Sequence, residues 1–300
     1  MRVAHGVVSR IVFVALVALM APACTDSEPP ATTSASASPI ASSFPAPTTT
    51  TTTTTRPPPD LQSVVDAFVA DQAVPFSVIV LDLSTGARAS HLGDRRVRSA
   101  SLFKLYVARE LVRRFHAGTL RRDAAAGDGS GRTIEECLHA MIVVSDNDCG
   151  FAGLRVVGGG ALNAGLHRDG FVSTSLSSPQ QTSADDTARF FEQAHDGTLL
   201  GPDGKEASRE LYDLLRLQEV NDRLPQGLPS GTPIAHKTGD IRQWAHDAGV
   251  ITTPRGDVVL VVLSGPWPLP CCDADHPGTA ERIAFGAIAD LGRAVYDAVA

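Results

Sequence analysis

Lysine is the scarcest charged residue in this chain. Lysine and arginine together number 26, but only Lys104, Lys205 and Lys237 are lysine. An arginine stays protonated under essentially all conditions, whereas a lysine shielded from water can lose its proton and act as a base. A lysine kept in such an arginine-rich chain therefore marks a candidate position for proton transfer.

Clusters of positive charge are missing as well. The chain has 33 acidic residues and a formal net charge of −7, and aromatic residues make up 5% of it. It contains no basic block and no interleaving of basic and aromatic residues, which are the patterns typical of nucleic-acid binding. We therefore do not expect nucleic acid as a partner.

No apolar run is long enough for a permanent membrane span, which needs about 20 residues. The run over residues 11–20 follows two arginines and precedes small residues and Cys24. A basic start, a short apolar core and small residues before a cleavage point are typical of an export signal. We expect residues 1–23 to be a signal peptide and Cys24 to carry lipid, which gives a cell-membrane lipoprotein facing the periplasm or cell wall. Plain secretion is the alternative.

Residues 24–59 and 60–300 differ sharply in composition. The first segment is dominated by Thr, Ser, Pro and Ala, with eight consecutive threonines at 48–55. Such a segment cannot bury apolar surface, so we predict a disordered tether that begins at the lipidated cysteine. Residues 60–300 are enough for one domain with a sizeable core.

Cysteine is rare too. Of five in the chain, four lie in the predicted domain: Cys137, Cys149, Cys271 and Cys272. An even count in an exported protein permits two disulfides, and Cys137 with Cys149 is favoured because the two are close in sequence. A bond between the adjacent Cys271 and Cys272 would be strained, so free thiols are an alternative there. The histidines show no metal-ligand spacing with these cysteines, so we expect no metal and no cofactor.

Hydrophobic periodicity predicts strands near both ends of the domain and helices between them. Strands at both ends imply one sheet built from the two termini, with a helical block inserted, which is an α/β class. The predicted helices are 61–70, 101–115, 133–141, 148–157, 160–168, 184–195, 206–217 and 278–298, and the predicted strands are 75–83, 87–92, 232–237, 246–252 and 258–265.

Three short motifs contain two of the three lysines. S-L-F-K at 101–104 places Ser101 three residues before Lys104, and residues three apart share one face of a helix. S-D-N at 145–147 lies in a short link between predicted helices, and K-T-G at 237–239 ends a predicted strand that can line a cleft. S-x-x-K alone is common by chance, whereas the three motifs in this order are a specific signal.

The same ordered set occurs in class A β-lactamases and penicillin-binding proteins. Over residues 60–300 the chain resembles that family of penicillin-recognising serine hydrolases, and most of all its class A β-lactamase-like branch. The hairpin before Ser101, G-G-G-A-L-N-A-G-L-H-R-D-G at 158–170 and H-D-A-G-V-I at 246–251 are also similar. The resemblance implies a five-stranded antiparallel sheet flanked by helices, with an all-helical lobe. We expect a monomer.

The resemblance also implies a chemical role for each motif residue. Ser101 would be the nucleophile and Lys104 its general base. Ser145 would pass a proton to the leaving nitrogen, and Lys237 would hold the Ser145 hydroxyl in an electropositive field. Asp146 would be a buried structural carboxylate rather than a catalyst.

The implied substrate contacts come from the same motifs. Asn147 would bind the side-chain amide of the substrate. Thr238, beside Gly239 in the strand, would bind its carboxylate. The backbone N–H groups of Ser101 and Asp240 would form the oxyanion hole, because they would point at the developing charge.

Arg223 and Asp240 are two further candidate residues of the site. Arg223 lies where some family members place a carboxylate-binding arginine, and a surface ion pair is the alternative. Asp240 departs from the family pattern, in which small or hydroxylated residues occupy this position. A carboxylate there should repel an anionic substrate.

The chain also lacks the glutamate that activates the deacylating water in efficient members of the family. No glutamate occurs between residues 136 and 192, and the segment 172–186 is too short for the corresponding loop. The acids nearby, Asp169, Asp185 and Asp186, have the positions of helix ends or caps. Asp185 or Asp186 acting as a substitute base is the alternative to slow deacylation.

Three functions remain open at this point. The first is an acyl-serine hydrolase that forms a covalent acyl-enzyme with β-lactams or with peptidoglycan-derived D-alanyl peptides. The second is an envelope esterase or transacylase that uses the same nucleophile on another acyl donor. The third is a catalytically silent lipoprotein that binds muropeptides, although the intact Ser101 and Lys104 argue against it.

Overall fold

The computed structural model describes residues 60–267 and 280–300. The predicted signal peptide and tether, Cys24, Cys271 and Cys272 lie outside these residues, so those expectations stay predictions. Within the described ranges, no helix combines the length and apolar character that crossing a membrane requires.

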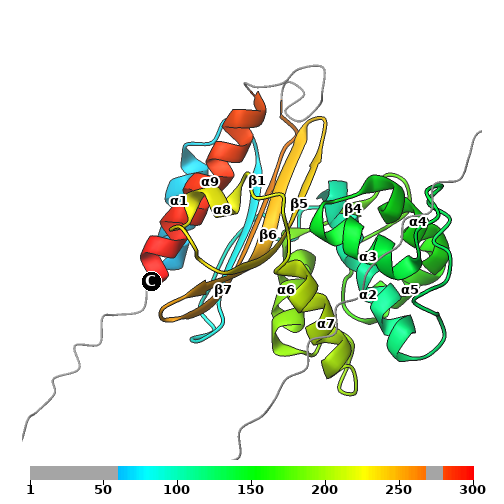
Figure 1. Cartoon of the computed structure of the whole chain (residues 1–300). Helices are drawn as coiled ribbons and strands as arrows, with labels where there is room; N and C mark the ends of the chain where they lie inside the picture. The colour runs from blue at the N-terminus through cyan, green and yellow to red at the C-terminus, as the bar shows by residue number, and fades with distance from the viewer. Residues whose placement is uncertain (1–59, 268–279) are drawn as a thin grey trace, which may run out of the picture. The chain divides into compact units, whose positions relative to one another are not determined.

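A five-stranded antiparallel sheet forms the centre of the described domain, with strand order β2-β1-β7-β6-β5. The first two strands come from the beginning of the domain and the other three from near its end (Figure 1). The predicted fold class is therefore confirmed. The strands are β1 (Phe76–Asp82), β2 (Arg88–His91), β5 (Ile234–Ile241), β6 (Trp244–Thr253) and β7 (Gly256–Ser264).

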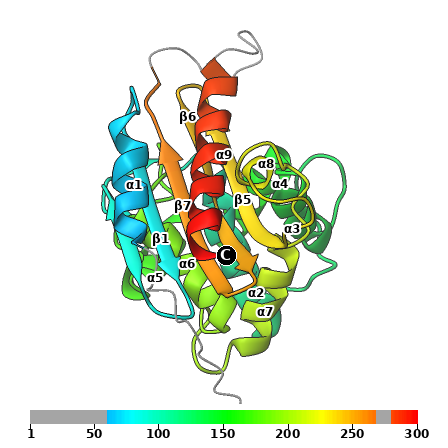
Figure 2. The same ribbon diagram turned by 90° about the vertical axis from the view of Figure 1, so that its left-hand side faces the viewer.

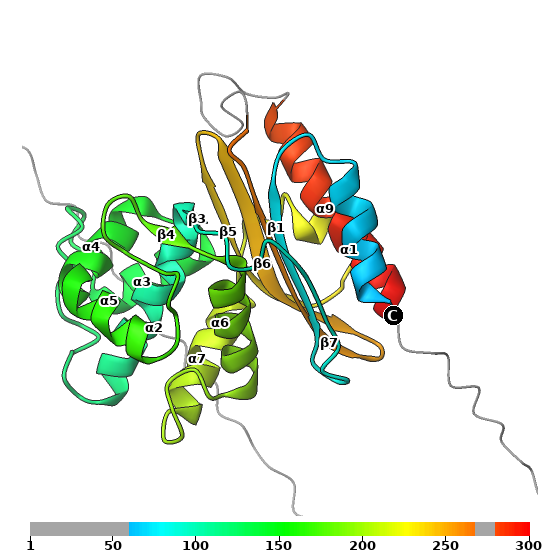
Figure 3. The ribbon, with the colours of Figure 1, turned by 180° about the vertical axis from the view of Figure 1, so that it is seen from behind.

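Helices cover both faces of the sheet. One face carries α1 (Leu61–Ala70), the short α8 (Leu224–Gly227) and α9 (Ala280–Val299), which lie in front of the strands in Figure 2. The opposite face carries α6 (Ala184–Asp196), next to α7 (Lys205–Leu215), with the helical lobe beyond them (Figure 3).

The alternation of side chains along β1 supplies two hydrophobic cores. All seven residues of this strand are buried, because neighbouring residues of a strand point to opposite faces and both faces are covered. Val78 and Val80 pack in the cluster that includes α1 and α9. Ile79 and Leu81 pack in the larger cluster that extends into the helical lobe.

The helical lobe is built around one central helix. The 3₁₀ turn η1 (Ala100–Leu102) leads into α2 (Phe103–His116), which is buried on nearly all sides. A helix that is buried all round needs neighbours on every side, and α7 packs against it together with the other helices of the lobe. These are α3 (Ile134–Val143), α4 (Asn147–Val157) and α5 (Gly159–Arg168).

The structure departs from the sequence expectations in four places, one of which is the short helix α8, which was not predicted. The helix predicted over 101–115 begins with η1, so Ser101 lies in a 3₁₀ turn rather than in the α-helix. Strand β5 continues to Ile241, so K-T-G lies inside this edge strand rather than at its end. The pair of short strands β3 (Val97–Arg98) and β4 (Gln181–Thr182) was not predicted, because two residues show no periodicity.

Candidate active site

The side chains of Ser101 and Lys104 meet at the start of the central helix. Lys104 Nζ lies 3.0 Å from Ser101 Oγ. It also lies 2.6 Å from the Ser145 carbonyl oxygen, 3.2 Å from Ser145 Oγ and 2.8 Å from Asn147 Oδ1. Three of the expected site residues therefore surround a single amine.

Burial changes the proton affinity of this amine. The Lys104 side chain has no exposed surface. Burial lowers the pKa of Lys104 to about 8, although the charges of Asp146 and Asp240 oppose the shift. On the order of a tenth of such side chains are neutral at pH 7, compared with well under a thousandth for an ordinary lysine. The neutral form can accept the proton of Ser101.

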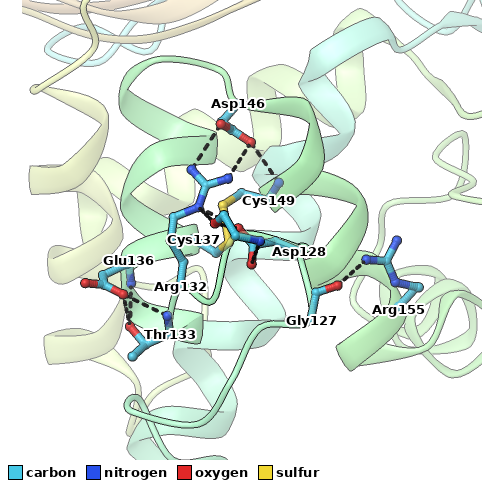
Figure 4. The surroundings of a disulfide bond; sticks show 10 residues. Gly127, Asp128, Arg132, Thr133, Glu136, Cys137, Asp146, Cys149 and Arg155 are labelled. Carbon is cyan, nitrogen blue, oxygen red and sulfur yellow. Dashed lines mark hydrogen bonds and ion pairs between the residues drawn. A yellow bond between two sulfur atoms is a disulfide. The ribbon is translucent and has the colours of Figure 1, made fainter. Parts of the chain in front are cut away.

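The S-D-N link is held by contacts from the lobe. Ser145 has a φ of 60°, in the left-handed region, where a non-glycine residue persists only if its surroundings impose it. Asp146 caps α4 by accepting from the Cys149 backbone N–H at 2.8 Å, and its carboxylate lies 3.1 Å from Arg132 (Figure 4). Asp146 is therefore structural as expected, but it is half-buried rather than buried.

Cys137 and Cys149 form a disulfide, as their spacing in sequence suggested. It joins α3 to the first turn of α4 and thus fixes the two helices on either side of the S-D-N link (Figure 4). The carboxylate of Asp128 lies close enough to both sulfurs for a metal site. The sulfurs are bonded to each other, however, and Asp128 instead pairs with Arg132 at 2.6 Å.

The third motif, K-T-G in β5, contacts the Ser145 hydroxyl from the sheet. Lys237 Nζ donates to Ser145 Oγ at 2.9 Å and to the Thr238 carbonyl oxygen at 3.0 Å. Burial, and then the charge of Lys104, hold the pKa of Lys237 well below its usual value. Two lysines from different elements therefore share Ser145 Oγ.

Gly239 lets the sheet edge approach the nucleophile. A Cβ at this position would lie 3.2 Å from the backbone nitrogens of Ser101 and Leu102 and from the Ser99 carbonyl oxygen. A side chain would therefore push β5 away from η1. Glycine in K-T-G serves the close approach of two backbones.

Ser101 opens into a pocket of about 170 Å³. Its apolar side includes Phe103 and Phe151, whose rings stack with centroids 5.3 Å apart. Sequence reasoning missed this wall, because nothing in the sequence shows that Phe151 of α4 is 44% exposed. The pocket is lined by Arg98, Ala100, Ser101, Phe103, Asn147, Phe151, Gln180, Asp240 and Ile241.

The third lysine, Lys205, lies in a different pocket. Lys205 lines a larger pocket of about 250 Å³, together with His195 of α6 and Arg216 at the end of α7. None of the motif residues lines it. We therefore treat the pocket at Ser101 as the candidate active site.

Arg223 and Asp240 pair with each other. Arg223 Nη2 lies 2.5 Å from Asp240 Oδ1, and the arginine is 1% exposed. Arg223 therefore forms an ion pair, as its alternative role held, but the guanidinium is buried rather than at the surface. Asp240, one residue after K-T-G, presents its carboxylate to the pocket instead.

Asp169, and the two acids considered as substitute bases, Asp185 and Asp186, lie elsewhere. Asp169 is the C-terminal cap of α5, and Asp185 pairs with Arg88 at 2.6 Å. Asp186, in the first turn of α6, accepts from Thr174 Oγ1 at 2.7 Å. None of these three carboxylates lines the pocket at Ser101, whose only lining carboxylate within the described ranges is Asp240.

Two supporting residues were also missed from the sequence. A Cβ at Gly150 would lie 2.7 Å from Lys104 Cε, so this glycine leaves room for the lysine side chain. His246 Nε2 donates to the Arg98 carbonyl oxygen at 2.7 Å, and His246 Nδ1 accepts from the Ser264 backbone N–H at 3.2 Å. Burial lowers the pKa of His246 to about 4, which keeps this link neutral.

The comparisons with known proteins agree with this fold. Residues 60–299 match the family described as the Beta-lactamase enzyme family, and no curated protein matches the chain. Among solved structures, PBP-A has a TM-score of 0.69 and 24% identity, with 81% of this chain and 98% of PBP-A covered. The ancestral GNCA class A β-lactamase has a TM-score of 0.66 and 26% identity, with 79% and 99% covered.

A β-lactamase from Sphaerobacter thermophilus DSM 20745 has a TM-score of 0.69 and 22% identity, with 80% of this chain and 98% of that protein covered. At such identities the structural similarity supports the fold. The family assignment rests instead on the family model, which matches residues 60–299. The protein therefore belongs to the β-lactamase enzyme family and is a serine hydrolase.

Proposed function

We propose that the protein forms a covalent acyl-enzyme at Ser101 with β-lactams or D-alanyl peptides, and that this intermediate is hydrolysed slowly. The observation that carries the proposal is the 3.0 Å contact between Ser101 Oγ and a buried lysine whose pKa is lowered to about 8. A hydroxyl beside an amine that is partly neutral at pH 7 is an activated nucleophile.

The contacts support a balanced sequence of proton transfers. Ser101 Oγ attacks the carbonyl carbon of the substrate and its proton passes to Lys104 Nζ. The C–N bond then breaks, and Ser145 Oγ gives its proton to the leaving nitrogen. Ser145 recovers a proton from Lys104, which lies 3.2 Å away, while Lys237 holds the hydroxyl in place.

The positions of Asn147 and Gly239 fit roles in binding. Asn147 lines the pocket beside Ser101, where its amide can contact the acyl side of a substrate. Gly239 lies against the backbone of η1, and this arrangement suits an oxyanion hole formed by the N–H groups of Ser101 and Asp240. Thr238, which the resemblance implies as the residue that binds the substrate carboxylate, is 2% exposed and does not line the pocket, so its position does not support that role.

Intact-mass spectrometry after exposure to a fluorescent penicillin tests the acylation. We expect one added penicillin per chain, and peptide mapping should locate it on Ser101. Ser101→Ala should remove the adduct while the melting temperature stays close to that of the wild type. A penicillin adduct that persists in Ser101→Ala would refute the proposed nucleophile.

Slow deacylation is proposed because the described residues offer the pocket no carboxylate that is free of an ion pair. Its only lining carboxylate in the described part of the chain, that of Asp240, is bound by Arg223, and Gln180 contributes an amide. A general base is typically worth about 10²–10⁴-fold in rate, so water should attack the ester slowly. A β-lactam fragment also stays tethered in the site, whereas the leaving group of a D-alanyl peptide departs.

A pre-steady-state trace with a chromogenic β-lactam tests this part of the proposal. We expect a burst of about one equivalent of enzyme, followed by a slow phase. Turnover of many molecules per second without a burst would contradict slow deacylation. Asp185→Asn and Asp186→Asn would then show whether either aspartate had replaced the missing base.

We also propose that the protein is exported and anchored through lipid at Cys24, on the basis of the N-terminal sequence pattern. Metabolic labelling with a palmitate analogue should mark the wild type but not Cys24→Ser. Cys271→Ser is the matched control and should label like the wild type. Equal labelling of Cys24→Ser and the wild type would exclude the lipid anchor and leave plain secretion.

A further inference from the structure

The guanidinium of Arg223 is engaged behind the pocket at Ser101. Its Nη2 is bound to Asp240 Oδ1, and its Nη1 donates to the His246 carbonyl oxygen at 3.2 Å. Its central carbon lies 3.8 Å from the centroid of the Phe285 ring. The Arg223 side chain is 2% exposed, whereas that of Asp240 is 42% exposed. The carboxylate, and not the guanidinium, therefore faces a substrate.

The charges that line this pocket cancel. Arg98 and Asp240 are the two charged residues among those that form it. Lys237 is buried and directs its amine to Ser145 and to a backbone carbonyl. A substrate carboxylate near K-T-G would meet the negative charge of Asp240, while the cations of Arg223 and Lys237 are already engaged, and like charges in contact disfavour binding. Among the described residues, Arg98 is the one lining cation that opposes this effect.

We propose that Asp240 makes this site selective for acyl donors that carry a neutral hydrogen-bond donor, such as a carboxamide, in place of the carboxylate that penicillins and D-alanyl peptides carry. The inference rests on the proposed acylation of Ser101 and specifies its substrate. Arg223 fixes one oxygen of Asp240. Among the described residues no hydrogen bond reaches the other oxygen, so that oxygen can accept from a substrate N–H.

Three compounds share the same β-lactam ring and differ only in the group at the carboxylate position, so they isolate the effect of the substrate's charge. They are penicillin G, its carboxamide and its methyl ester. Intact-mass spectrometry gives the second-order acylation rate for each. In the wild type we expect the carboxamide to react at least about tenfold faster than the carboxylate. The methyl ester is neutral but lacks a donor, so its rate should fall between the other two.

Asp240→Asn should lower the ratio of the carboxamide rate to the carboxylate rate by at least about tenfold, because it removes the negative charge and keeps the backbone N–H. Asp148→Asn removes an exposed negative charge of α4 that does not line the pocket. This control should leave the ratio unchanged.

The outcomes separate this inference from the proposed function. If the compounds acylate Ser101 but Asp240→Asn leaves the ratio unchanged, the inference is wrong and the proposed function stands. A wild-type preference for the carboxylate that disappears in Arg98→Gln would also overturn the inference and would make Arg98 the anion-binding residue. If no compound acylates Ser101 in any variant, both fail.

Discussion

Replacing Lys104 by arginine should almost abolish acylation, although the variant keeps both the positive charge and most of the side-chain length. The lowered pKa of Lys104, about 8, makes the neutral amine available near pH 7. Relative to an ordinary lysine, the neutral fraction is larger by on the order of 10²-fold. An arginine cannot release its proton under these conditions, so the base is lost.

The expected loss is that of a general base, about 10²–10⁴-fold in the second-order rate of acylation. The pH profile gives a second, independent signature. Because the neutral amine is the active form, the wild-type rate should rise about tenfold per pH unit below the pKa and level off above pH 8 or so. Lys104→Arg should lose this rise together with the rate.

The assay is the rate of labelling by a fluorescent penicillin, measured from pH 6 to pH 9. Lys205→Arg is the matched control, because Lys205 is exposed and lines a different pocket. It should keep both the rate and the profile of the wild type. Labelling of Lys104→Arg at the wild-type rate, or with the same rise in pH, would show that Lys104 is not the base.

Three further predictions concern packing and stability. Gly150→Ala should slow acylation by about 10²-fold, because its Cβ would displace Lys104; Gly286→Ala meets nothing within 4 Å, and equal rates for the two variants would contradict the effect. Lys104→Met should raise the melting temperature at pH 7, since a lysine whose folded pKa is below its unfolded pKa destabilises the fold until the pH exceeds both values; a lower melting temperature would contradict this. Reduction of Cys137–Cys149, which closes a loop of 12 residues, should cost about 3 kcal/mol of unfolding free energy in denaturant titrations, and an unchanged midpoint would count against it.

The elements that the sequence predicted well are those whose burial follows a long pattern. β1 is a continuous apolar run because both of its faces are covered, and α2 shows a helical spacing over four turns. The two-residue strands β3 and β4 have no such pattern. They form because the segments before Ser101 and after Gln180 lie side by side, as the hydrogen bond from the Ser99 backbone N–H to the Gln180 carbonyl oxygen shows.

The site residues also divide into those that the sequence could predict and those that it could not. The three motifs identify residues by type and spacing, and the structure brings them together around Ser145 Oγ. Arg223, just before α8, pairs with Asp240 of β5, and the two residues are 17 apart in sequence. Spacing could nominate Arg223 as a cation near the cleft, but only the fold shows that Asp240 occupies it. The role of Gly150 could not be predicted from the sequence either, because this glycine leaves space for a side chain of another helix.

The geometry around Ser145 explains why an arginine-rich chain keeps lysine at two motif positions. The amines of Lys104 and Lys237 lie 3.2 Å and 2.9 Å from the same hydroxyl oxygen, and neither side chain is exposed. Two buried ammonium groups so close together repel each other, and burial adds the cost of desolvating each charge. Releasing a proton relieves both costs, and only lysine can release it. Two arginines there would hold both charges and leave no base for Ser101, which is the physical reason for lysine at these two positions.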